Sequence, residues 1–321
     1  MESARTQEAT SARKSAHAQE ATHVQEAARA RKSVRAQEIA SLVSMLDDLD
    51  DSIMPLITEK LRALKPDSST LLAISSTYQG NTILHNRLSR LISELQKDEL
   101  ERDFDAWQNE RDPELLKGLW LVNRALFPHL AYDILEHLCM DMAKDVWVEL
   151  TDNKTAVEKV HLYNHVFYHR IGFRIDLSLS ELEYALLDVA LDKRQANPIL
   201  FGLIYLDVAF RSGLPIRAMA FSGGFLPVCV DENERFLFYI NIYNNGEIFG
   251  KEQLAAFLSD YGLSIPYEHF TLCNVFTLVG IYAESLYLIA GNMGNIEMEQ
   301  KMESFLKLFG DQRFLITEED E

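Results

Sequence analysis

Cysteine and histidine are among the side chains of this sequence that could act as a nucleophile, a base or a metal ligand. The three cysteines lie far apart in the chain and form no CxxC pair: Cys139, Cys229 and Cys273. An odd number of widely spaced cysteines gives no disulfide framework and is typical of a reducing compartment. We therefore expect free thiols and a cytoplasmic protein.

Three histidines follow one another at helical spacing, at His161, His165 and His169. Positions i, i+4 and i+8 lie on one face of a helix, and this spacing can bind a metal ion such as Zn²⁺. No neighbouring cysteine or carboxylate adds an obvious further ligand. We interpret the three as structural histidines, with a metal site as the alternative, and we expect no cofactor.

A helix followed by a hairpin is the arrangement of elements that would position catalytic side chains in this chain. Pro198 begins an apolar helix that we predict to run to Phe210. Two strand-like runs follow, at 224–230 and 235–243, and turn-forming residues 231–234 separate them. This pattern predicts an antiparallel hairpin.

Short motifs on these elements resemble those of the transglutaminase-like superfamily, in the bacterial SirB type. They are Gly172-Phe173-Arg174, Asn197-Pro198-Ile199-Leu200, Gly213-Leu214-Pro215, Ser222-Gly223-Gly224-Phe225-Leu226 and the run from Tyr239 to Gly246. Their order and spacing carry the resemblance, which extends more weakly from about residue 41 to 309. It implies a papain-like core, in which a Cys at the helix start is activated by a His on the first strand and an Asp on the next.

All three catalytic positions implied by the resemblance hold other residues. The nucleophile should lie within 198–200, where there is neither Cys nor Ser. Gly224 stands at the His position and Asn241 at the Asp position, and no His occurs between residues 196 and 268. An amide cannot hold a proton as a carboxylate does, so acyl transfer by the family mechanism is not expected.

The predicted hairpin supports this alignment. A turn over 231–234 pairs Val230 with Arg235, and the same register sets Gly224 opposite Asn241. Facing residues of an antiparallel pair have Cβ atoms about 5 Å apart. Cys229 lies about 17 Å from Gly224 along the strand, on the opposite sheet face, and we interpret it as a buried, inert thiol.

Other features have two interpretations each. The glycines at 223 and 224 either open a groove for a peptide or small ligand, or allow a tight bend, which we prefer. Tyr243 could line a cleft, although core packing explains an aromatic near a strand equally well. Asp207 and Arg211 are interpreted as an exposed i, i+4 ion pair worth about 0.3–0.5 kcal/mol.

These interpretations lead to one predicted site and one predicted function. We predict a degenerate cleft that retains binding capacity, made of Asn197, Pro198, Ile199, Leu200, Gly223, Gly224, Phe225, Asn241 and Tyr243. The chain would then be a non-catalytic interaction or regulatory module whose partner is a protein or peptide. The alternative is an acyl-transfer or hydrolytic enzyme that uses a different set of residues in the same cleft.

The whole chain is predicted to be α+β and mostly helical, with a small antiparallel sheet. Four parts follow from composition and periodicity: a low-complexity extension (1–40), a helical region (41–150), the degenerate core (151–250) and a helical C-terminal region with an acidic tail (251–321). In the extension, the stretch from Ala12 to Glu20 is similar to that from Ala30 to Glu38, 18 residues on. We treat this extension as low complexity, with a partner-binding arm as the alternative.

Net charge and hydrophobicity limit the classes of partner. The extension has seven basic and five acidic residues, hence +2, and because the whole chain is −18 the remainder is −20. Such an acidic chain is not expected to bind nucleic acid or anionic membranes. There is no apolar run of about 18 residues and no apolar N-terminal stretch typical of a secretory signal. These features again predict a cytoplasmic protein.

Overall fold

The structure is a computed structural model that describes residues 36–45, 54–64, 71, 74, 76, 82–151, 153–176, 182–221, 224–260, 271–310 and 312–315. The predicted extension up to residue 35, Gly223 and the acidic tail 318–321 lie outside the described residues. The chain forms two compact units, residues 1–99 and residues 100–321.

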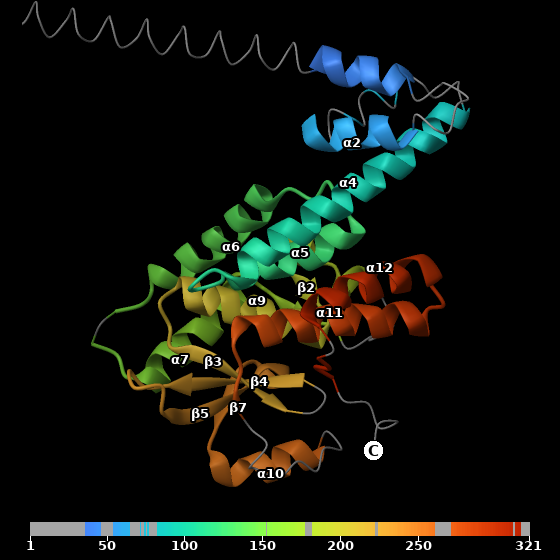
Figure 1. Ribbon diagram of the computed structural model, residues 1–321. Helices are drawn as coiled ribbons and strands as arrows, with labels where there is room; N and C mark the ends of the chain where they lie inside the picture. The colour runs from blue at the N-terminus through green and yellow to red at the C-terminus, as the bar shows by residue number, and fades with distance from the viewer. Residues whose placement is uncertain are drawn as a thin grey trace, which may run out of the picture. The chain divides into compact units, whose positions relative to one another are not determined.

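The first unit is helical throughout its described part. Residues 36–45 form a helix, α2 spans Met54–Leu64, and the unit also holds most of α4, Thr82–Gln108 (Figure 1). Buried aliphatic side chains make a core of their own: Ile39, Val43, Ile57, Leu61, Leu71, Leu84, Leu88, Leu91, Ile92 and Leu95. Arg62 adds ion pairs to Glu94 at 3.2 Å and to Asp98 at 3.4 Å.

The second unit combines helices with a small sheet. Its α-helices are α5 (Leu115–Leu126), α6 (Tyr132–Trp147), α7 (Ala156–Asn164), α8 (Leu187–Lys193), α9 (Pro198–Arg211), α10 (Lys251–Asp260), α11 (Val275–Asn292) and α12 (Ile296–Leu306). A π-helix, His165–Arg170, continues α7, and short 3₁₀ turns occupy Leu182–Ala185, Ile242–Asn244 and Lys307–Phe309. α11 has the length and composition of a membrane span, but 61% of it is buried within the fold, as in a core helix.

The main sheet has five strands in the order β6-β5-β4-β3-β7, and each neighbouring pair is antiparallel. The strands are β3 (Ile216–Phe221), β4 (Gly224–Val230), β5 (Phe236–Asn241), β6 (Glu247–Phe249) and β7 (Thr271–Leu272). A separate parallel pair joins β1 (Arg174–Ile175) to β2 (Gln195–Ala196). The predicted α+β class, mostly helical with a small antiparallel sheet, is confirmed.

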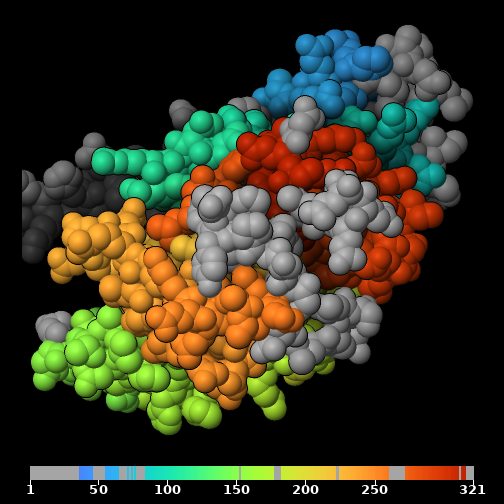
Figure 2. Space-filling view, turned by 90° about the horizontal axis from the view of Figure 1, so that it is seen from below, coloured from blue at the N-terminus to red at the C-terminus, as the bar shows by residue number. Residues whose placement is uncertain are grey.

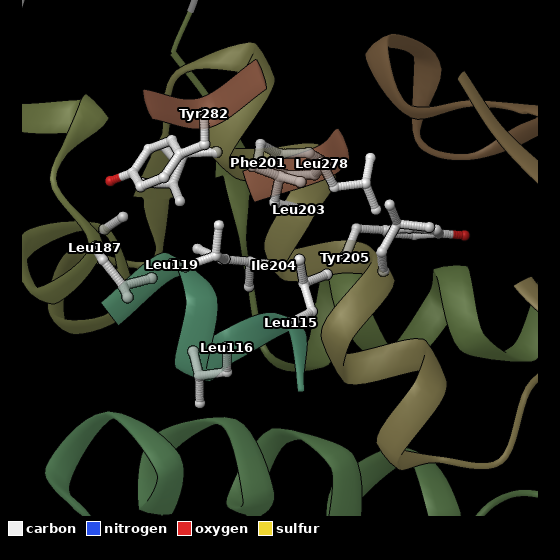
Figure 3. Close-up of a cluster of buried hydrophobic side chains, with 14 of the residues drawn as sticks. Leu115, Leu116, Leu119, Leu187, Phe201, Leu203, Ile204, Tyr205, Leu278 and Tyr282 are labelled. Atoms are coloured by element: carbon white, nitrogen blue, oxygen red, sulfur yellow. The ribbon is translucent and has the colours of Figure 1, made fainter. Parts of the chain in front are cut away.

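Helix α9 lies at the centre of the second unit. It contacts α5, α6, α11, β3 and β4, and its residues are buried from Leu200 to Ala209. A helix that is apolar on all sides must be enclosed on all sides. Figure 3 shows this core, where side chains of α9 meet those of α5, α8 and α11: Phe201, Leu203, Ile204, Tyr205, Leu115, Leu116, Leu119, Leu187, Leu278 and Tyr282.

The two faces of the sheet pack on different helices. Toward α9, the sheet contributes Ile216, Ala218, Phe225, Cys229, Phe238 and Ile240 to the main core. The opposite face packs against Leu254 and Leu258 of α10 through Leu226, Val228, Val230, Tyr239 and Phe249. Seen from below, α10 is the outer surface over this face (Figure 2, orange). Alternation along each strand therefore decides which helix a side chain meets.

The predicted register of the hairpin is wrong. Val230 pairs with Phe236, Cys229 with Phe238 and Val228 with Tyr239, with a shift between Cys229 and Val230. The side chain of Asp231 explains the change, because its carboxylate accepts bonds from the backbone N–H of Asn233 and Arg235, both at 2.9 Å, and from Arg235 Nε at 2.7 Å. Arg235 is thereby held in the loop rather than paired with Val230.

Strand β3 was not predicted. It joins the sheet between β4 and β7, with Phe221 paired to Gly224 and Ile216 to Cys229. Its sequence, Ile-Arg-Ala-Met-Ala-Phe, has two alanines and no β-branched residue after Ile216. The strand is therefore fixed by pairing with β4 and not by local preference.

The interpretation of Asp207 and Arg211 as an exposed pair is also wrong. The side chain of Asp207 is 2% exposed and that of Arg211 10%, and Arg211 Nε donates to Asp207 Oδ2 at 2.6 Å. Asp207 also accepts the backbone N–H of Leu116 at the start of α5. Arg211 binds Glu114 as well, and Tyr132 donates to Glu114 at 2.7 Å. Burial raises the pKa of the Asp207 carboxyl, although Arg211 acts in the opposite direction.

Replacing Arg211 by Met should lower the free energy of unfolding by about 3–5 kcal/mol, because it leaves Asp207 buried without its cation. The exposed i, i+4 pair of Lys301 and Glu297 on α12 is the control, and Lys301→Met should change stability by less than about 0.5 kcal/mol. Urea titration measures both. Equal, small losses for the two variants would show that the Asp207 pair behaves as an exposed one.

The contact between α9 and the sheet can be tested at Gly202. A Cβ there would lie 2.8 Å from Phe225 Cζ and 3.1 Å from Ile242 Cδ1, whereas a Cβ at Gly291 of α11 has only Glu299 within 4 Å. Gly202→Ala should therefore destabilise by about 1–3 kcal/mol through overpacking. Gly291→Ala should stabilise by up to about 1 kcal/mol, since alanine is the better helix former. A stabilising Gly202→Ala would mean that Phe225 does not pack there.

Candidate functional site

The start of α9, where the resemblance implies a nucleophile, is a helix cap. Asn197 is buried, and its Oδ1 accepts the backbone N–H of Leu200 at 2.9 Å, while its own N–H donates to Tyr184 O at 2.7 Å. Pro198 occupies the first turn, where its missing N–H costs nothing. Leu200 is completely buried and Ile199 partly so. Residues 197–200 therefore start and anchor the helix, and none can attack a carbonyl.

Phe225 of β4 packs against this helix at Gly202. Its ring lies where a side chain at Gly202 would be, and the Cδ1 atom of Ile242 approaches the same point. Phe225 is 8% exposed and belongs to the main core. The space between α9 and the first residues of β4 is therefore filled by an aromatic ring.

Gly224 does not face α9. By alternation it shares a sheet face with Leu226 and Val228, which pack on α10. A Cβ at Gly224 would have only ring atoms of Phe221 within 4 Å, the nearest at 3.7 Å.

Asn241 lies on the same sheet face as Gly224 but is not opposite it. The observed register, continued past Val228, places Asn241 level with Leu226, and on its other side Asn241 pairs with Glu247 of β6. Its Oδ1 accepts the N–H of Tyr243 at 3.0 Å and so caps the 3₁₀ turn that follows. Tyr243 itself is 41% exposed. The predicted cleft residues are thus divided between the two faces of the sheet.

A buried hydrogen-bond network, not predicted from the sequence, holds this region together. Asn164, at the end of α7, donates to Gly246 O at 2.6 Å and accepts from Tyr205 Oη of α9 at 2.6 Å. Tyr163 Oη donates to Tyr205 O, also at 2.6 Å. Gly246 has φ +75°, and a Cβ there would lie 2.3 Å from the Asn164 amide. Asn164 therefore ties α7, α9 and the turn after β5 to one another.

This network offers no acid or base near neutral pH. Burial raises the pKa of Tyr163 and of Tyr205 well above the usual value, so both phenols stay protonated. Asn164 does not titrate. In the sequence, the feature that could have indicated this network is Asn164, which directly precedes the metal candidate His165.

The three histidines are exposed to solvent. The rings of His165 and His169 are neighbours, with centroids 5.4 Å apart, in the π-helical continuation of α7. Among the residues that the structure describes, no three His, Cys, Asp or Glu side chains form a group able to hold a metal ion.

The thiols are protected by burial. Cys139 and Cys229 are buried and Cys273 is partly buried, and none is in a disulfide. Desolvation raises the pKa of Cys229 to about 11 and of Cys273 to about 12, and that of Cys139 well above its usual value. All three thiols are therefore protonated at neutral pH and lack the thiolate that nucleophilic catalysis needs.

Comparison with known proteins agrees with the predicted superfamily. Residues 133–277, from α6 to the first turn of α11, match the model of the Transglutaminase-like superfamily, so the chain contains a transglutaminase-like domain. A UPF0162 protein of Vibrio cholerae serotype O1 is 25% identical to this chain over 159 residues. That alignment covers 49% of this chain and 56% of the relative, so the chain spans about half the length of the relative it matches. No solved structure gives a significant match.

Native protein should resist alkylation by iodoacetamide at neutral pH at Cys139 and Cys229, because both thiols are buried and protonated. Mass spectrometry of each cysteine peptide, with and without urea, measures this. A Val148→Cys variant supplies an exposed control, since Val148 is 68% exposed, and its new thiol should react readily. Fast reaction of Cys229 in the folded protein would contradict the inert interpretation.

Proposed function

We propose that this chain is a non-catalytic, SirB-type transglutaminase-like protein that acts in the bacterial cytoplasm as an interaction or regulatory module. The observation that carries the proposal is the start of α9. Residues 198–200 provide no nucleophile, and the amide of Asn197 is used to cap the helix. Catalysis by the family mechanism starts from a nucleophile at this point, with a base beside it.

The surroundings of α9 support the same conclusion. Phe225 fills the space against the helix, and Gly224 and Asn241 lie on the sheet face that packs on α10. Restoring a single catalytic residue is therefore not expected to restore activity, because Gly224 and Asn241 are on the sheet face opposite Phe225. The sequence and packing here serve the stability of the domain.

A protein or peptide partner is supported by exposed apolar side chains on and next to α6. Trp147 is 69% exposed, Val148 68% and Ile134 63%. Tryptophan is enriched among the residues that carry most of the binding energy at protein interfaces. α6 lies within the region that matches the superfamily model.

Purified protein should show no transfer of a primary amine to a glutamine-containing peptide, and no hydrolysis of peptide or ester substrates. An active transglutaminase is the positive control, and the Cys229→Ala and Asn241→Ala variants set the background. The wild-type protein should be indistinguishable from both variants. Turnover that disappears in either variant would overturn the proposal and favour an enzyme that uses a non-family set of residues.

A further inference from the structure

A pocket of about 410 Å³ lies between α11, α12 and the chain that follows α12. It is distant in the sequence from the start of α9 and shares no residue with the predicted cleft. Its size is in the range of small-molecule sites, which span about 300–1,000 Å³. The charged residues that line it are Glu284, Glu303, Lys307 and Arg313.

One wall of the pocket is held in place by Glu284 of α11. Glu284 Oε2 accepts the backbone N–H groups of Phe314 and Leu315 at 2.7 and 2.8 Å. The ring of Phe314 lies over Gly280, where a Cβ would come within 2.4 Å of it. The segment after α12 is therefore fixed to α11 by two hydrogen bonds and by a ring that only glycine accommodates.

The second carboxylate oxygen of Glu284 is available to a ligand. The side chain is 4% exposed, and within the described residues its Oε1 atom accepts no hydrogen bond. The nearest cation is Arg313 Nη1 at 3.6 Å. A carboxylate with so little access to water is stabilised by a further hydrogen-bond donor. A charged donor such as an ammonium group forms the stronger bond.

The other charges determine what kind of ligand fits. Glu303 pairs with Lys307 at 3.0 Å, so the pocket contains two carboxylates and two cations. The side chains of Lys307 and Arg313 are 71% and 75% exposed, and among the described residues each forms one ion pair, so each has further N–H groups that can bind an anion. A simple anion would be repelled by Glu284, and a simple cation by Arg313. A molecule that carries both a positive and a negative charge can pair with Glu284 through one and with Arg313 through the other.

We propose that this pocket binds a small zwitterion, a free amino acid or a short peptide, with its ammonium on Glu284 Oε1 and its carboxylate on Arg313 and Lys307. Tyr287 and Leu306 line the same pocket and provide the surface for the ligand's side chain. The proposed site does not depend on whether the chain catalyses acyl transfer, because it uses no residue of the predicted cleft.

Isothermal titration of the full chain with the common free amino acids and with glycyl dipeptides tests the proposal. At least one of them should bind. Its N-acetyl and its amide derivatives should each bind at least about tenfold more weakly, since each loses one charged contact. Absence of binding by every zwitterion, or equal binding by the capped derivatives, would overturn the proposal.

Matched variants locate the site. Arg313→Gln should weaken binding by about tenfold or more. Lys301→Gln is the control. Lys301 pairs with Glu297 on α12 and does not line the pocket, so this variant should bind as the wild type does. Glu284→Gln should also abolish binding, provided that thermal unfolding shows a folded protein. Equal losses in Arg313→Gln and Lys301→Gln would place the ligand elsewhere.

Discussion

The enclosure of α9 is the constraint on which the second unit depends. A helix that is buried from Leu200 to Ala209 needs partners on every side, and α5, α6, α11 and two strands provide them. Such a helix can tolerate a charge only if that charge is fully compensated. Asp207 meets this condition through Arg211 and the backbone N–H of Leu116, so the one carboxylate of α9 also fixes the start of α5.

The same enclosure accounts for the residues found at the start of the helix. Asn197 and Pro198 provide what a helix start needs, a cap and a first residue without a donor. Gly202 lets the ring of Phe225 reach the helix, and Asn164 holds the turn after β5 against Tyr205. Asn197 and Asn164 bind backbone groups, and Tyr205 Oη donates to the Asn164 side chain. The transglutaminase-like domain of residues 133–277 is thus organised here around packing.

How much the sequence predicts depends on whether a feature is set by local or by distant contacts. The apolar helix from Ile199 to Phe210, the strands of β4 and β5 and the loop between them are local, and the structure contains them. The hairpin register was missed because the side chain of Asp231 draws Arg235 out of the ladder. Spacing could show that Asp207 and Arg211 are neighbours, but a helix apolar on all sides gives no indication of which residues are exposed.

The predicted cleft residues lie on two faces of the sheet for a related reason. Gly224 and Asn241 do share a sheet face, as the alternation of strand residues predicts, but that face packs on α10. Which helix covers which face is a tertiary property, and the residue that meets α9 is Phe225 instead. The pocket beside Glu284 was not predicted at all, because it joins α11 to the segment after α12 through bonds to backbone groups.

The central claim is that Phe225, and not Gly224 or Asn241, packs against α9 at Gly202. Nuclear Overhauser contacts measured on the labelled protein test it most directly. Strong contacts from the Phe225 ring to Gly202 Hα and to the Ile242 methyl groups are expected, together with none from the Asn241 side-chain amide to Pro198. Contacts between Asn241 and Pro198, with none from Phe225 to Gly202, would contradict the account.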